Sequence, residues 1–166
     1  MLINSLMQKA ADRFFIFIFL TALLSAAACD ILSGPSISDT PPQIEQKIFN
    51  LVNDHRRSIG LNELAWSDAI AEQARLHSQS MAAGKVPFGH DGFDDRIALI
   101  AETIPWQSAG EVVALAATAA AAVDGWLASA EHKPLLEGSF GWTGIGVAKS
   151  KSGSSLYATQ IFIKPR

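Results

Sequence analysis

The side chains best suited to chemistry in this chain are two histidines and a glutamate at the ends of predicted elements. His90 lies in a loop rich in glycine and aspartate, Glu111 follows Gly110, and His132 follows the end of a predicted helix. Side chains at such boundaries can converge in one cleft. Two imidazoles and a carboxylate suffice for zinc or another divalent metal with open positions. They also suit a pH-responsive hydrogen-bond network or a satisfied polar cluster that closes the fold.

No complete catalytic motif accompanies these three residues. The sequence contains no phosphate-binding loop, dinucleotide fingerprint, zinc-protease helix or nucleophile elbow. The single cysteine, Cys29, lies ahead of the predicted domain, and no motif places a serine beside a histidine and an aspartate. We therefore expect a binding protein rather than an enzyme.

The other polar residues favour structural roles. His77 shares a helix face with apolar residues, which predicts a packing histidine. His55 is expected on a helix surface or at the rim of the cleft. Asp94 and Asp95 are expected to complement the N-terminus of a short helix, and Arg96 is expected to pair with one of them. The four tryptophans are expected chiefly in the core, although Trp106, in a predicted loop near the Glu111 segment, could line the cleft.

Helical and extended patterns alternate along the chain and predict an α+β fold. Helices are predicted from about Thr40 to Gly60, Ser67 to Gly84, Phe93 to Ile100 and Ala116 to Ser129. A loop through Trp106 is expected to lead to the segment 109–113. Two strands, 142–150 and 155–163, are predicted to form a closing hairpin, and residues 61–66 a short extended link.

Residues 1–28 have the composition of a signal peptide. Lys9 and Arg13 precede an apolar stretch that ends in small residues, as signal peptidase requires. The uncharged run 14–29 contains 16 residues, whereas a membrane-spanning helix needs about 20. A cleaved leader is therefore favoured over an uncleaved anchor.

Cys29 follows the leader directly and resembles the lipid-modified cysteine of a bacterial lipoprotein. The alternative is an ordinary cleavage site, Ala26-Ala27-Ala28, that happens to precede a free thiol. Since an exposed free thiol suits an oxidising compartment poorly, lipidation is favoured. Residues 29–43 then form the lipidated cysteine and a tether rich in serine and proline. We expect a membrane-anchored lipoprotein, with a secreted or periplasmic protein as the alternative.

Length and charge limit the remaining possibilities. At 166 residues the chain has room for one domain, assigned to residues 44–166, and we expect a monomer. The net charge of −3, without clusters of lysine and arginine, argues against nucleic acid as a partner.

Six motifs in order resemble the CAP superfamily, also called the SCP domain, in its disulfide-free bacterial branch. They are Leu51-Val52-Asn53-x-His55, Leu64-x-Trp66, His90 with Phe93-Asp94-Asp95-Arg96-Ile97, Ala109-Gly110-Glu111, and Trp126-Leu127-x-Ser129-x-x-His132, followed by Gly144-Ile145-Gly146-Val147-Ala148. The resemblance covers about residues 44–163. It implies an α-β-α sandwich whose central cleft is lined by His90, Glu111 and His132.

The chain departs from the family pattern at two positions. Val112 replaces the usual asparagine after the glutamate, and Ser129 occupies the position of a fourth acidic residue. Glu131 is nearby but out of register, so Ser129 and Glu131 are assigned only to the rim. The resemblance favours a surface-tethered module that binds a cell-surface, wall or lipid ligand. The alternatives are a metal-dependent hydrolase of peptide or cell-wall material and a lipid- or sterol-binding module.

Overall fold

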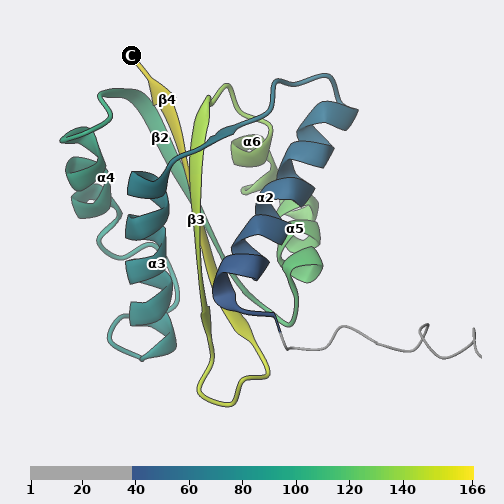
Figure 1. The fold of residues 1–166 in the computed structure, drawn as a ribbon, viewed down its shortest axis with the longest axis vertical. Coiled ribbons are helices and arrows are strands. Elements are labelled where there is room, and N and C mark those ends of the chain that lie inside the picture. The colour runs from purple at the N-terminus through teal and green to yellow at the C-terminus, as the bar shows by residue number, and fades with distance from the viewer. Residues whose placement is uncertain (1–38) are drawn as a thin grey trace, which may run out of the picture. The chain divides into compact units, whose positions relative to one another are not determined.

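A four-stranded sheet lies between two layers of helices in the computed structural model, which describes residues 39–166 (Figure 1). The predicted leader, Cys29 and residues 30–38 of the predicted tether lie outside the described residues. The elements are α2 (Pro41–Ser58), β1 (Ala65–Trp66), α3 (Asp68–Ala82), α4 (Phe93–Ala101), β2 (Trp106–Ala116), α5 (Ala119–Ala128), α6 (Lys133–Leu136), β3 (Trp142–Lys149) and β4 (Leu156–Pro165). The structure thus has the expected α+β class and α-β-α layering.

The strand order in the sheet is β1-β3-β4-β2. The hairpin of β3 and β4 forms the antiparallel centre, and β1 pairs in parallel with β3. The long strand β2 pairs antiparallel with β4 at one edge, with Glu111 opposite Ile161. Glu111 therefore lies in the middle of an edge strand.

The two faces of the sheet carry separate hydrophobic clusters. One face, with Val112, Ile145 and Phe162, packs against α2 and α5. The other, with Ile161 and Ile163, packs against α3 and α4. Alternate residues of a strand point to opposite faces, which is why Phe162 of β4 belongs to one cluster and its neighbours Ile161 and Ile163 to the other. Figure 1 shows α3 and α4 on one side of the strands and α2, α5 and α6 on the other.

Local signals fix the starts of the helices. The backbone N–H of Thr40 donates to Oε1 of Gln43 at 2.8 Å, which completes the start of α2. Ser67 Oγ accepts from the backbone N–H of Ile70 at 3.5 Å at the start of α3. Asp94 and Asp95 lie in the first turn of α4, where negative charge is favourable. These predicted boundaries are confirmed.

Two glycines let α3 lie directly against β3. A Cβ atom at Gly144 would collide with the backbone of Ile70 and Ala71, and one at Gly146 with that of Ala74 and Arg75. Because glycine has no Cβ, helix and strand approach more closely than other residues allow. This close packing fixes α3 against the face of the sheet on which the candidate site lies.

The prediction for residues 106–116 was wrong. This segment forms the eleven-residue strand β2, where a loop through Trp106 and a helix beginning at Ala116 were expected. Helices cover both faces of β2, so its side chains are small or apolar on both faces and show little period-two alternation. The helix that follows begins only at Ala119.

The tryptophans divide between core and surface. Trp126 is fully buried, and its indole N–H donates to the carbonyl of Val113 at 3.0 Å. Trp142 is exposed at the start of β3, which corrects the expectation of a core residue.

Within residues 39–166, no helix has the length and apolar character needed to cross a membrane.

Candidate functional site

The centre of the candidate site is the carboxylate of Glu111, which is almost completely buried on the α3 and α4 face of β2. Its side chain is 1% exposed. Arg96 Nε donates to Oε2 at 3.0 Å, and Arg96 Nη2 donates to Oε1 at 2.8 Å. This bidentate arrangement is the strongest geometry of an arginine–carboxylate pair. The buried negative charge is therefore compensated.

His90 is the exposed member of the cluster. Its Nδ1 lies 2.9 Å from Glu111 Oε1, and its side chain is 49% exposed. Because a carboxylate only accepts hydrogen bonds, Nδ1 carries the proton in this contact when the carboxylate is ionised. In the neutral ring, Nε2 then keeps a free lone pair, and the structure gives Nε2 no partner within residues 39–166.

Arg96 also connects the carboxylate to the loop that carries His90. Its Nη1 donates to the carbonyl of Asp91 at 2.8 Å and to Nδ1 of His77 at 3.1 Å. His77 Nε2 in turn donates to the carbonyl of Gly89 at 2.8 Å. These two contacts fit the neutral imidazole with its proton on Nε2.

The cluster therefore holds three successive loop residues. His77 binds Gly89, Glu111 binds His90, and Arg96 binds Asp91. A side chain whose support is fixed in this way loses little conformational freedom when it binds a ligand. The result is a rigidly placed imidazole with one open nitrogen.

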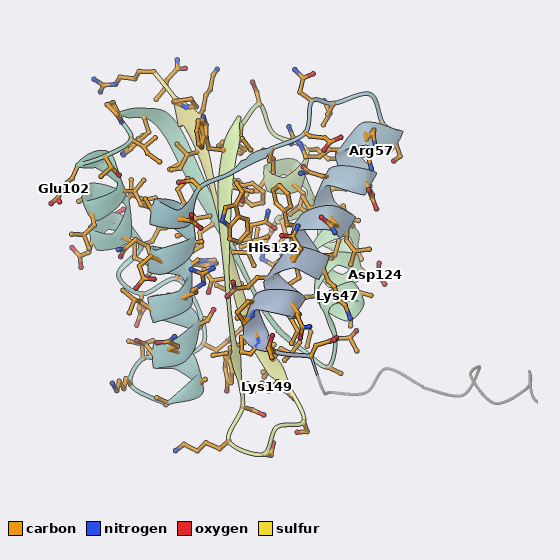
Figure 2. The ribbon with its side chains drawn as sticks, in the orientation of Figure 1. Lys47, Arg57, Glu102, Asp124, His132 and Lys149 are labelled. Atoms are coloured by element: carbon orange, nitrogen blue, oxygen red, sulfur yellow. The ribbon has the colours of Figure 1, made fainter. Side chains whose placement is uncertain are left out.

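His132 lies on the other side of the sheet. It is the N-cap of α6, and Leu135 of α6 lies against Gly110, whose neighbour Glu111 points to the opposite face. Figure 2 shows His132 on the side of the strands that carries α2 and α5, away from α4. Within residues 39–166 no hydrogen bond or ion pair joins its imidazole to His90 or Glu111.

The two predicted rim residues lie in the turn that precedes α6. Ser129 Oγ accepts from the backbone N–H groups of Glu131 and His132, each at 3.3 Å. Ser129 therefore stabilises its own turn, and Glu131 is exposed beside it. In the described part of the chain, neither side chain has a hydrogen bond or ion pair with the cluster around Glu111.

The residues as placed do not form a ready metal site. In the part of the chain that the structure describes, no three His, Cys, Asp or Glu side chains are grouped to hold a metal ion. Both oxygens of Glu111 accept from Arg96 and lie buried, whereas Nε2 of the half-exposed His90 has no partner among the described residues. A metal site formed by His90, Glu111 and His132 stays a prediction.

Sequence reasoning missed two members of the cluster. Arg96 pairs with Glu111, where Asp94 or Asp95 was expected, and His77 is a hydrogen-bonded connector as well as a packing residue. The sequence did contain a pattern that indicates a buried role for Arg96. It is a charged residue on the helix face that also carries Phe93 and Ile100, and a buried arginine requires a buried acceptor. Glu111 is the one carboxylate in the apolar segment 109–116.

Comparison with known proteins gives a consistent family. The family model described as the cysteine-rich secretory protein family, CAP, matches residues 49–162. An extracellular protein containing a SCP domain from Bacillus anthracis is 34% identical, with a TM-score of 0.63 over 80% of this chain and 45% of its own. No curated protein matches.

Two further solved structures share the fold. A cysteine-rich secretory protein from Staphylococcus aureus is 18% identical, with a TM-score of 0.62 over 76% of this chain and 40% of its own. An outer surface protein from Borrelia burgdorferi is 17% identical, with a TM-score of 0.61 over 73% of this chain and 92% of its own. The chain thus spans less than half the length of the Bacillus and Staphylococcus chains.

Proposed function

The chain belongs to the CAP family of cysteine-rich secretory proteins, and from that premise we propose that it is an exported, membrane-tethered module that binds a cell-surface ligand at His90. The ligand contact is the open Nε2 atom of His90. The ligand belongs to the wall or lipid material that surrounds an exported bacterial protein. In this proposal no covalent chemistry takes place at the site.

One observation carries the proposal: a buried carboxylate orients an exposed imidazole. Glu111 is held by Arg96 and binds His90 Nδ1 at 2.9 Å, so the opposite nitrogen points away from the carboxylate. The neutral ring accepts a hydrogen bond from a ligand N–H or O–H at Nε2, and the protonated ring donates one. Such a site is suited to selective hydrogen bonding.

Binding is favoured over hydrolysis because the cluster contains no nucleophile. His77, Arg96, Glu111 and His90 bind one another and the loop backbone. Ser129 Oγ accepts hydrogen bonds from its own turn, and among residues 39–166 it has none to His90. A serine or cysteine nucleophile requires an adjacent base.

A hydrolase remains the second candidate, on one specific ground. An imidazole whose Nδ1 donates to a carboxylate is the arrangement of histidine general bases and of many metal-binding histidines. His90 has this arrangement. A bound metal would supply an activated water molecule, but the grouping of ligands found in the structure does not support one.

The proposal of export is supported by the sequence and by the relatives, and the proposal of tethering by the sequence alone. The Bacillus relative is described as extracellular and the Borrelia protein as an outer surface protein. The leader 1–28 and Cys29 account for export and attachment of this chain, and the tether places the domain at a distance from the membrane.

Ligand binding is tested by sedimentation with purified cell-wall sacculi and by flotation with phospholipid vesicles. His90→Gln is expected to weaken binding to one of the two at least tenfold. His55→Gln is the matched control, because His55 also bonds a carboxylate, Glu137, at 2.8 Å. Equal binding by the wild type and both variants would overturn the role of His90, and failure to bind either material would overturn the ligand class.

The enzymatic alternative is tested with peptide and peptidoglycan substrates. Hydrolysis that disappears in Glu111→Gln, while His55→Gln stays active, would replace the binding proposal by the hydrolase. Zinc titration addresses the metal separately. If His90→Ala/His132→Ala binds zinc as tightly as the wild type, the predicted metal site is wrong.

Attachment of the protein to the membrane through Cys29 is tested by adding a radioactive fatty acid to cells that express the chain. Label is expected on the wild type and not on Cys29→Ser. An unlabelled wild-type protein recovered from the medium would contradict the tether and leave the His90 site unaffected.

A further inference from the structure

We propose that a cavity between α4 and β2 is a second binding site, specific for a small quaternary ammonium ion. The cavity has a volume of about 260 Å³. It is lined by Phe93, Asp94, Ile97, Ala98, Trp106 and Ala109. These residues lie outside the cluster that binds His90.

Two of the six lining residues are aromatic. Phe93 comes from the first turn of α4 and Trp106 from the start of β2, and both are half-buried at the margin of the cluster formed by Ile97 and Ile163. The faces of phenyl and indole rings attract cations, and indole does so most strongly. A cation with an apolar surface is therefore attracted to this wall.

Asp94 supplies the only charge in the lining. Its carboxylate is exposed, and the structure gives it no hydrogen bond or ion pair within residues 39–166. Arg96, two positions later on the same helix, forms its ion pair with Glu111 and not with Asp94. Arg166 donates its Nε–H to the carbonyl of Trp106 at 3.0 Å and does not line the cavity. The cavity is therefore complementary to a single positive charge.

The same lining selects among cations. A primary ammonium group brings three N–H donors, each of which requires an acceptor when it loses water. Asp94 is the one polar side chain that could accept them. A quaternary ammonium ion has no N–H donors and can place its methyl groups against both rings. It loses fewer hydrogen bonds on entry, so we expect it to be preferred.

The cavity and the His90 site are close in the sequence but separate in chemistry. The backbone N–H of Phe93 donates to the carbonyl of His90 at 3.0 Å, whereas the ligand atom of His90 is on its side chain. Occupation of the cavity therefore does not require the proposed wall or lipid ligand. Failure of one proposal leaves the other intact.

The test uses the full chain and two probes of nearly the same shape, choline and its uncharged carbon analogue 3,3-dimethylbutan-1-ol. Binding is followed by the indole N–H resonance of Trp106 in nuclear magnetic resonance, which the variant Trp106→Leu identifies by its loss. Choline is expected to shift this resonance saturably. The neutral analogue is expected to bind at least tenfold more weakly.

Matched variants test whether the carboxylate of Asp94 supplies the negative charge that attracts choline. Asp94→Asn is expected to weaken choline binding about tenfold and to leave binding of the neutral analogue unchanged. Asp95→Asn is the control, because Asp95 is the adjacent carboxylate of the same turn and does not line the cavity. Equal loss in the two variants would show a diffuse charge effect and overturn the site.

Two other results would also overturn the proposal. Equal binding of choline and its neutral analogue would indicate a merely apolar cavity. Tighter binding of n-butylammonium than of choline would assign the cavity to primary amines. Both measurements report on folded protein, because the other indole resonances, including that of the buried Trp126, serve as the internal reference for the fold.

Discussion

Arg96 binds both oxygens of the Glu111 carboxylate, with Nε 3.0 Å from Oε2 and Nη2 2.8 Å from Oε1. The pair joins α4 to the edge strand β2, and its side chains are 10% and 1% exposed. Glu111 binds the His90 side chain and Arg96 binds the carbonyl of Asp91, so the pair connects this loop to the sheet. The position of the exposed imidazole thus depends on a buried ion pair.

Removal of one partner is expected to be costly. Arg96→Met leaves the Glu111 carboxylate buried without its counter-charge, and breaking a buried pair costs about 3–5 kcal/mol. The free energy of unfolding in urea measures this loss. Arg57→Met is the control, because Arg57 forms its pairs with Asp54 and Glu63 at the surface, and little change is expected there. Similar losses in both variants would contradict the role assigned to Arg96.

Replacement of both partners is expected to restore much of the stability. Arg96→Met/Glu111→Leu removes the buried charge together with its partner, and apolar replacements of buried pairs are often neutral or stabilising. Unfolding in urea should show a smaller loss for the double variant than for Arg96→Met alone. A double variant as unstable as the single one would mean that packing, and not the unpaired charge, determines the cost.

The same double variant is expected to change the tautomer of His90. In the wild type, Nδ1 donates to Glu111, which favours the tautomer that carries its proton on that nitrogen. Without the carboxylate acceptor, the proton should redistribute between the two nitrogens. Nitrogen chemical shifts of the imidazole measure this redistribution, and His55, which bonds Glu137 through Nε2, is the internal control. An unchanged tautomer at His90 would show that Glu111 does not orient it.

Loss of His77 is expected to loosen the loop. His77→Phe keeps the ring volume but leaves the carbonyl of Gly89 without its donor and Arg96 without one acceptor. A buried polar group left unsatisfied costs about 1–3 kcal/mol. Hydrogen exchange of the backbone amides in residues 89–93 should accelerate. Ser80→Ala, at an exposed position of the same helix, should leave this exchange unchanged.

Two glycine substitutions are expected to act in opposite directions. Gly146→Ala places a Cβ against the backbone of α3, and overpacking costs about 1–3 kcal/mol. Gly125→Ala lies in α5, where a Cβ meets nothing within 4 Å, and alanine stabilises a helix by up to about 1 kcal/mol over glycine. Thermal unfolding of the two variants measures both effects. A stable Gly146→Ala variant would contradict the close approach of α3 and β3.

Much of the fold could be predicted because its signals are local. The starts of α2 and α3 at Thr40 and Ser67, the short helix after Gly92 and the hairpin of β3 and β4 follow from residues a few positions apart. The strand β2 could not be predicted in this way. Its apolar character on both faces results from helices distant in the sequence, so the alternation that identifies an exposed strand is missing.

The candidate site, like the fold, could be predicted from the sequence only in part. The sequence indicated His90 and Glu111 as functional residues, and the structure places their side chains 2.9 Å apart. It also indicated His132, which the structure places at the start of α6 without a bond to either residue. The linking roles of Arg96 and His77 appeared only in the structure.

The sequence by itself indicated the family and the residue types of the site, and it predicts a leader ahead of Cys29. Only the tertiary structure decided that Arg96 pairs with Glu111, fifteen positions away, rather than with an aspartate in its own helix turn. The physical reason is burial. Asp94 and Asp95 remain in water at the start of α4, whereas the packing of α4 against β2 removes the Arg96 and Glu111 side chains from water together, so each must satisfy the other.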